Sequence, residues 1–310
     1  MSEHRLDFLK DFDVPQFADW LEVAREELQG SDPETKLAWQ VDDLQGLPYY
    51  TANHTNSLIT SSAIIPPWKN MPLVTVNNET ESNRFALDHL NEGADGILFS
   101  IPNNSVISFE KLLKKIEWPH CTISFLLDEL NTIFPSALHD YIGKAGFNSG
   151  ELTGSIFIKT YPQHPQTINN LIHNLIPFTN FDSLGFYIHS GKPADRIASA
   201  LTEAVQVAEH LAAAGISQSV SLQRISFAIE TGADFFIEIA TLKALRMLWF
   251  QVVHAYGLSD YQPADLTIHS ISPAWVNQAL APHSNMLKST TASLAAIIGG
   301  CNALSVLPEA

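Results

Sequence analysis

Polar side chains fall at the ends of three segments that have the composition of buried strands. Tyr187 and His189 end one segment, Glu230 ends the next, and the third contains His269 and Ser270. An imidazole at a strand end can act as a general acid or bind a substrate carbonyl. The alternative for His269 is a hydrogen-bonded histidine in a filled or vestigial pocket, and for His189 an ordinary turn residue. These residue types indicate a pocket but do not predict which reaction it would catalyse.

Other chemical signals in the sequence are few. Lys159 ends an earlier strand and could meet an anion, although a lone lysine at a sheet rim is commonly solvated. Glu238 and Arg246 share a predicted helix and are expected to form surface or interhelix ion pairs. No Cys-x-x-Cys, His-x-x-x-His or G-x-S-x-G pattern occurs, so no metal site and no serine nucleophile are predicted. Cys121 and Cys301 are expected to be buried free thiols in a reducing cytoplasm.

Charge limits the classes of ligand. The 310 residues include 33 acidic and 17 basic side chains, a formal net charge of −16. Nucleic acid is therefore not an expected partner, and an anion such as a coenzyme A ester would need local cations. The longest apolar run, residues 293–307, is short for a membrane span and is interrupted by two glycines. We expect a helix end, a turn and a strand there, no membrane contact, and no secretory signal at the N-terminus.

Strand-like and helical segments alternate from Leu73 to the end of the chain, which predicts parallel strands joined by crossover helices. The alternation favours an α/β fold, a (β/α)8 TIM-type barrel. The eight expected strands are Leu73–Val76, Gly96–Ile101, Cys121–Leu127, Gly154–Thr160, Leu184–His189, Arg224–Glu230, Leu266–Ile271 and Ala303–Pro308. The expected helices are Glu81–Glu92, Ser108–Ile116, Pro135–Lys144, Thr167–Ile176, Pro193–Ala214, Ala233–Tyr256 and Asn285–Ile298.

Two features lie outside that alternation. A full barrel needs a helix after strand eight, which the sequence does not supply, so we expect an excised part of a longer protein, truncated after that strand. Residues 1–66 contain an expected amphipathic helix, Pro15–Gln29, followed by turn-rich sequence. They are interpreted as an N-terminal helical and extended arm that wraps a partner, and residues 67–310 as the barrel domain.

Several segments resemble the methylmalonyl-CoA mutase family. They are RISF at 224–227, DFFIEIA at 234–240, LRMLW at 245–249, LTIHSISPAW at 266–275, NMLKSTT at 285–291 and GGCNALSVLP at 299–308. Near the N-terminus, residues 20–30 and LPYYT at 47–51 resemble the family's small subunits. The resemblance implies a barrel of the kind through which coenzyme A threads, associated with cobalamin radical isomerisation of methylmalonyl-CoA to succinyl-CoA.

Departures from the family pattern fall at the positions that face substrate. Phe157 stands where the family has a glutamine, and Ile271 replaces another, although His269 is retained. An ungapped match places Tyr187 at the family's catalytic histidine, and His189 reaches that position only with a two-residue shift. The cobalamin loop has no counterpart here. The resemblance therefore implies the small, non-catalytic subunit, whose vestigial pocket would be occluded by the phenylalanine and isoleucine side chains.

The implied partner is a large catalytic subunit, in a heterodimer, with adenosylcobalamin bound by that partner and no cofactor bound by this chain. A homodimer is the expectation when the partner is absent. The aromatic residues expected to anchor the partner, or alternatively to pack on the barrel itself, are Phe17, Trp20, Tyr49, Tyr50 and Trp68. Two other functions stay open: an acyl-CoA-binding or isomerising barrel with a site near His269 and His189, and a self-sufficient mutase.

Overall fold

The computed structural model describes residues 16–42, 44–51, 66–102, 106–161, 165–175, 178–274 and 284–308. Contacts between Cα atoms divide the chain into two units, residues 1–63 and 64–310. The start of the expected helix at Pro15 lies outside the described residues. In the described part of the first unit, helices α1 and α2 precede a hairpin of two short antiparallel strands. Their bounds are α1 Phe17–Glu27, α2 Pro33–Lys36, β1 Trp39–Val41 and β2 Leu44–Gly46.

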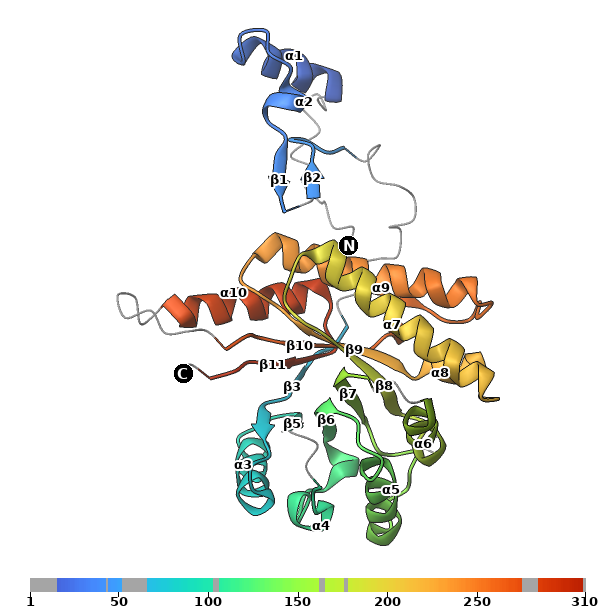
Figure 1. Ribbon diagram of the computed structural model, residues 1–310. Helices are drawn as coiled ribbons and strands as arrows, with labels where there is room; N and C mark the ends of the chain where they lie inside the picture. Colours follow the sequence, from blue (N-terminus) through green and yellow to red (C-terminus); the bar gives the residue numbers. More distant parts are fainter. Residues whose placement is uncertain are drawn as a thin grey trace, which may run out of the picture. The chain divides into compact units, whose positions relative to one another are not determined.

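The second unit is built on one sheet of nine strands, each parallel to its neighbours, in the order β3-β11-β10-β9-β8-β7-β6-β5-β4 (Figure 1). The strands are β3 Lys69–Asn70, β4 Leu73–Thr75, β5 Gly96–Ile101, β6 Thr122–Glu129, β7 Gly154–Thr160, β8 Phe181–Ile188, β9 Ile225–Glu230, β10 Ile268–Ile271 and β11 Ala303–Ser305. Parallel neighbours in chain order require a crossover between each pair. The α/β TIM-like fold expected from the sequence is confirmed.

The two edges of this sheet belong to one short segment, residues 69–75. Its first part, β3, pairs with β11, and its second part, β4, pairs with β5. Between them, the backbone N–H of Met71 donates to the carbonyl of Leu304, and the N–H of Leu98 donates to the carbonyl of Pro72. Pro72 has no N–H to offer to a ladder, which accounts for the interruption. The segment thus joins the first and last strands of the curled sheet.

Helices follow most strands and cover the outer side of the sheet (Figure 1). They are α3 Glu79–Asn91, α4 Phe109–Leu112, α5 Phe134–Ala145, α6 Pro165–Leu175, α7 Pro193–Ala213, α8 Gln218–Gln223, α9 Phe235–Ala255 and α10 Ser284–Gly299, with 3-10 turns at Trp118–His120 and Pro263–Asp265. The apolar run at 293–307 is divided into the end of α10, a turn and β11, as expected. In the described ranges, no helix is long and apolar enough to cross a membrane.

Strand side chains separate into two apolar clusters because successive residues point to opposite faces of a sheet. Ile97, Phe99 and Ile101 of β5 belong to a large cluster that includes side chains of the surrounding helices. Leu98, between them, belongs to a second, smaller cluster. The large cluster therefore lies between sheet and helices, and the small one lies on the inner face of the curled sheet.

Candidate functional site

The inner face of the sheet is the place where a barrel of this kind would hold a ligand, and here apolar side chains occupy it. The buried members of the inner cluster come from five strands: Leu98, Leu126, Phe157, Ala228 and Ile271. Leu73, Tyr187 and Leu307 are partly buried and pack against them. Barrel interiors are commonly filled by such layers of side chains. The layer contains two of the residues singled out in the sequence, Phe157 and Ile271.

Phe157 is fully buried, and its neighbour across the ladder is a glycine. A Cβ added to Gly185 would come within 2.5 Å of Cδ1 of Phe157 and 2.4 Å of the carbonyl oxygen of Ile156. The phenyl ring thus occupies the space that a side chain at position 185 would need. On its other side the ring meets His269 edge to face, with centroids 5.5 Å apart. Phe157 is therefore held by close packing around its ring.

His269 is buried beside this ring and hydrogen-bonded to the last strand. Its Nε2 lies 2.8 Å from Oγ of Ser305, and that hydroxyl donates its proton to the carbonyl of Met71. Because a serine hydroxyl has one proton, Nε2 of His269 must be the donor in the first bond. Burial lowers the pKa of His269 to about 3. The imidazole is therefore neutral at physiological pH and, through Ser305, links β10 to β11 and to Met71, the residue that follows β3.

Ser270 points to the other side of the same strand. Its hydroxyl forms a 2.6 Å hydrogen bond with that of Thr231, and Ser270 is fully buried. Because side chains alternate along β10, Ser270 lies on the face opposite His269 and Ile271. The sequence grouped these three residues in one pocket, whereas the structure places Ser270 outside the inner cluster.

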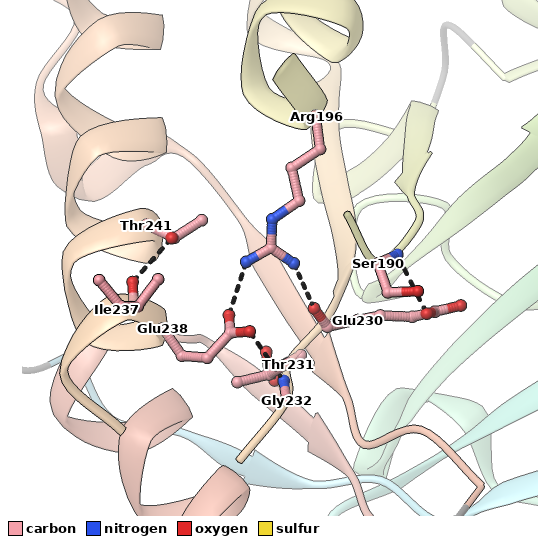
Figure 2. Close-up of polar contacts among 9 residues, drawn as sticks. Ser190, Arg196, Glu230, Thr231, Gly232, Ile237, Glu238 and Thr241 are labelled. Atoms are coloured by element: carbon pink, nitrogen blue, oxygen red, sulfur yellow. Dashed lines mark hydrogen bonds and ion pairs between the residues drawn. The ribbon is translucent and has the colours of Figure 1, made fainter. Parts of the chain in front are cut away.

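Tyr187 and His189 lie at the carboxyl end of β8, around the carboxylate of Glu230. The Tyr187 hydroxyl donates to Oε1 of Glu230 at 2.7 Å, and the backbone N–H of Ser190 donates to Oε2 at 3.1 Å (Figure 2 shows the second contact). Burial and the bond to Glu230 raise the pKa of Tyr187 well above its ordinary value. Nδ1 of His189 lies 3.9 Å from Oε1 of Glu230, and its side chain is 63% exposed. Both carboxylate oxygens therefore already accept bonds from donors.

A buried ion pair fixes the backbone beneath this carboxylate. Arg196 of α7 donates from Nη1 to the carbonyl of Glu230 at 2.9 Å and from Nη2 to Oε2 of Glu238 at 2.7 Å (Figure 2). The other oxygen of Glu238 accepts from the N–H of Gly232 at 3.0 Å. The two side chains are 7% and 10% exposed, so both charges are nearly removed from water. The expected ion pair of Glu238 is thus an interhelix one, between α9 and α7.

A pocket of about 370 Å³ opens beside this cluster. Lys159 lies on its wall, and its Nζ is 2.8 Å from Oδ1 of Asp128. The lining residues in the described part of the chain are Lys159, Tyr187, Ile188, His189, Ser190, Gly191, Lys192, Asp195, Arg196, Ser199, Ala200 and Glu203. His189 borders this pocket, while His269 lies buried in the interior. The structure therefore does not bring the two histidines into one site.

The chemistry that these groups can perform is limited. Two donors already engage Glu230, and the Lys159 ammonium is paired with a carboxylate, so neither is poised to take a proton from a ligand. His189 is accessible but has no hydrogen-bonded carboxylate at normal distance to orient it. Among the described residues, no group of three His, Cys, Asp or Glu side chains could hold a metal ion. The arrangement indicates that the polar side chains at the strand ends stabilise the fold.

Sequence reasoning did not foresee two buried charged groups. Arg196 was read only as part of an amphipathic helix, yet it links three elements through its guanidinium. Asp182 lies at the amino end of β8, where burial raises its pKa to about 6, although bonds from Thr267 and Ser155 and the charge of Arg224 oppose the shift. An acidic residue inside an apolar strand was the available signal for Asp182. For Arg196 the sequence offered none.

Comparisons with known proteins agree with the resemblance seen in the sequence. The family model described as methylmalonyl-CoA mutase matches residues 187–308. The methylmalonyl-CoA mutase small subunit of Porphyromonas gingivalis is 23% identical over 352 aligned residues, which cover 99% of this chain and 55% of that protein. The chain is thus similar to methylmalonyl-CoA mutases along nearly its whole length, and residues 187–308 match the family model itself. It spans about half the length of the curated relatives that it matches along most of its sequence.

Two further similarities differ in extent. The methylmalonyl-CoA mutase large subunit of Propionibacterium freudenreichii is 27% identical over 155 residues, covering 47% of this chain and 21% of that protein. Among solved structures, dihydropteroate synthase from Stenotrophomonas maltophilia gives a TM-score of 0.43 at 12% identity, covering 78% of this chain and 88% of that one. This structural similarity is weak. The similarity that extends over nearly the whole chain is to a mutase small subunit.

The structure shows where the residues that differ from the family pattern lie. Phe157, where the pattern has glutamine, and Ile271 lie in the inner apolar cluster. Tyr187, which an ungapped match aligns with the catalytic histidine, bonds to Glu230 and packs against that cluster.

The aromatic residues predicted to anchor a partner are largely accessible. Phe17, Trp20 and Tyr49 stack on one another, with ring centroids 5.2 to 6.2 Å apart. Tyr49 and Tyr50 are 37% and 51% exposed, and Trp68, in the second unit, is 42% exposed. Phe17 and Trp20 are partly buried, so the exposed members of the predicted set are Tyr49, Tyr50 and Trp68.

Proposed function

We propose that this chain is the small subunit of a methylmalonyl-CoA mutase and supports a large catalytic subunit without performing the isomerisation itself. The observation that carries the proposal is the inner cluster around Phe157 and Ile271, which occupies the barrel interior that an acyl-CoA chain would need. The similarity of nearly the whole chain to a mutase small subunit supports the same assignment. In this proposal the chain contributes shape and surface.

The chemistry belongs, in the proposal, to the partner. Adenosylcobalamin would be bound by the large subunit and would supply the radical rearrangement of methylmalonyl-CoA to succinyl-CoA. The two subunits would form a heterodimer in the cytoplasm. The stacked aromatic residues of the N-terminal unit would be among the contacts: Tyr49, which is exposed, and Phe17 and Trp20, which are partly buried. The curated relatives support this arrangement because small and large subunits are both among them.

Calorimetry on the isolated chain tests the absence of a substrate site. We expect no saturable heat on titration with methylmalonyl-CoA or succinyl-CoA, since the side chains of Phe157 and Ile271 lie in the apolar cluster on the inner face of the sheet. Saturable binding of either thioester would refute the proposal and would favour an acyl-CoA-binding barrel instead. Cobalamin-dependent turnover by the isolated chain would establish a self-sufficient mutase.

Co-expression tests the partnership. The chain is produced with the mutase large subunit of the same source organism, one subunit carrying an affinity tag, and the complex is sized by gel filtration with light scattering. We expect a one-to-one heterodimer that has mutase activity when supplied with adenosylcobalamin. A small subunit that elutes separately from an active large subunit would contradict the proposal.

A further inference from the structure

The outer face of helices α9 and α10 is almost uncharged. The two helices pack side by side on one side of the sheet (Figure 1), and the structure describes both from end to end. Lys243 is the one charged residue among the exposed residues of these two helices. The exposed residues are Phe236, Ala240, Lys243, Leu248, Gln251, Ala255, Met286, Leu287, Thr290 and Leu294. This absence of charge is unusual for helices that border water.

Large apolar side chains are concentrated on this face. Phe236 is 79% exposed, Leu287 70%, Met286 61%, Leu294 48% and Leu248 39%. Leu287 and Leu294 are seven residues apart and therefore lie on one side of α10. Several large exposed apolar side chains on two adjacent helices are typical of a protein contact.

Helix α3 shows what an ordinary outer face of the same barrel looks like. Its exposed residues include Glu81, Arg84 and Asp88. Phe85, 43% exposed, is covered by the guanidinium of Arg84, 4.7 Å from the ring centroid. The lack of charge on α9 and α10 is therefore a property of that face and not of the barrel as a whole.

The net charge of the chain favours a different protein over a second copy of this chain as the binding partner of the face. A second copy of this chain would bring another net charge of −16 against the first, and repulsion between like-charged copies opposes association. Lys243, the cation on the face, would meet a carboxylate or carbonyl of a different protein more favourably. The curated relatives include mutase large subunits as well as small ones, which names a different protein of the right kind.

We propose that the α9–α10 face is a docking surface for the mutase large subunit, an inference that rests on the function proposed above. Phe236 and Leu287 are its apolar anchors, because the side chains that protrude furthest lose the most water on binding. Lys243 sits among them as the polar contact. This surface is distinct from the aromatic cluster of the N-terminal unit and adds a second region of contact.

Two charge insertions test the surface. Leu287→Glu and Phe236→Glu each place a carboxylate on the face, at side chains exposed enough that folding should be unaffected. The matched control is Phe85→Glu, an apolar-to-charge change at an exposed position of α3. Thermal melting checks that all three variants fold as the unaltered chain does, and surface plasmon resonance measures the affinity of the full chain for the immobilised large subunit.

We expect each face variant to raise Kd at least about tenfold, which corresponds to about 1.4 kcal/mol, because a charge would replace an apolar anchor of the interface. The control should change Kd less than about twofold. If the unaltered chain and both face variants bind with equal affinity, the docking surface is elsewhere and the inference fails while the proposed function stands. If the unaltered chain does not bind the large subunit at all, the proposed function fails. Sedimentation of the isolated chain completes the test, since a homodimer dissolved by Leu287→Glu would assign the face to a second copy and overturn the inference.

Discussion

Replacing Phe157 by alanine tests the filled barrel interior most directly. The ring is fully buried among Leu98, Leu126, Ala228 and Ile271. A buried Phe→Ala change costs about 3–5 kcal/mol, from lost transfer free energy and the cavity left behind. We expect the upper part of that range, because Gly185 offers no side chain that could move into the space.

Urea unfolding followed by circular dichroism measures the loss. The midpoint should fall with little change in the dependence of the free energy on urea, because the native surface is nearly the same. The matched control is Phe236→Ala, whose ring is 79% exposed on α9 and whose loss should change the free energy of unfolding by less than about 0.5 kcal/mol.

A loss below about 1 kcal/mol for Phe157→Ala would refute the reasoning, since a side chain that fills a core cannot be removed so cheaply. Equal losses for both variants would refute it as well, because burial would then not distinguish the two rings. Calorimetry on the Phe157→Ala variant is informative in addition: a cavity of this kind is apolar and should still not bind a charged thioester.

Three further predictions address neighbouring contacts. Gly185→Ala should lower the free energy of unfolding by at least about 1–3 kcal/mol, measured by urea titration, because its methyl would meet Phe157 and a backbone carbonyl. For His269, whose pKa falls from 6.5 to about 3 on folding, acid should protonate the unfolded chain first. Stability should therefore decrease as pH falls from 6.5 towards 3, by up to about 1.4 kcal/mol per pH unit, and His269→Asn should lack this part of the slope in unfolding curves at several pH values. Glu238→Gln or Arg196→Met should each cost about 3–5 kcal/mol, while the double change should cost clearly less than their sum; an additive result would mean that the charges do not interact.

The sequence predicts most strands of the barrel because their apolar pattern is strong. Apolar runs bounded by glycine-stopped helices placed every expected strand from Gly96 onward within a few residues. The first expected strand, Leu73–Val76, corresponds to β4, but the structure adds the short strand β3, which Met71 and Pro72 separate from β4. Only the pairing partners, which lie far away along the chain, show that this segment serves both edges of the sheet.

Long-range contacts also explain the expectations that missed. The helix expected at 108–116 ends at Leu112, where the side chain of Asn83 donates to the carbonyls of Leu112 and Lys114. Lys115 then adopts a left-handed φ of 63°, which a helix cannot continue. Along α9, Trp249 is buried whereas Phe236 is exposed. Periodicity alone does not separate a core face from an interface.

The candidate pocket was predictable in part. Phe157 and Ile271 were expected to block the interior because bulky apolar residues stand where a family pattern is polar, and both lie in the inner cluster. The position of Ser270 on the opposite face follows from the alternation of side chains along a strand. The bond of His269 to Ser305 joins residues that sequence separation hides, and no local pattern predicts it.

The pairing of β11 with the segment 69–75 determines the order in which the domain can fold during synthesis on the ribosome. The Ser305 hydroxyl bonds to the carbonyl of Met71, 234 positions earlier in the chain. Every strand between them can pair with its predecessor as it emerges, yet the first must keep an unpaired flank until the last has been synthesised. While that strand edge is exposed during translation, a chaperone can bind it or another chain can pair with it wrongly. Formation of a contact between residues so far apart in the sequence should also make the final folding step slow.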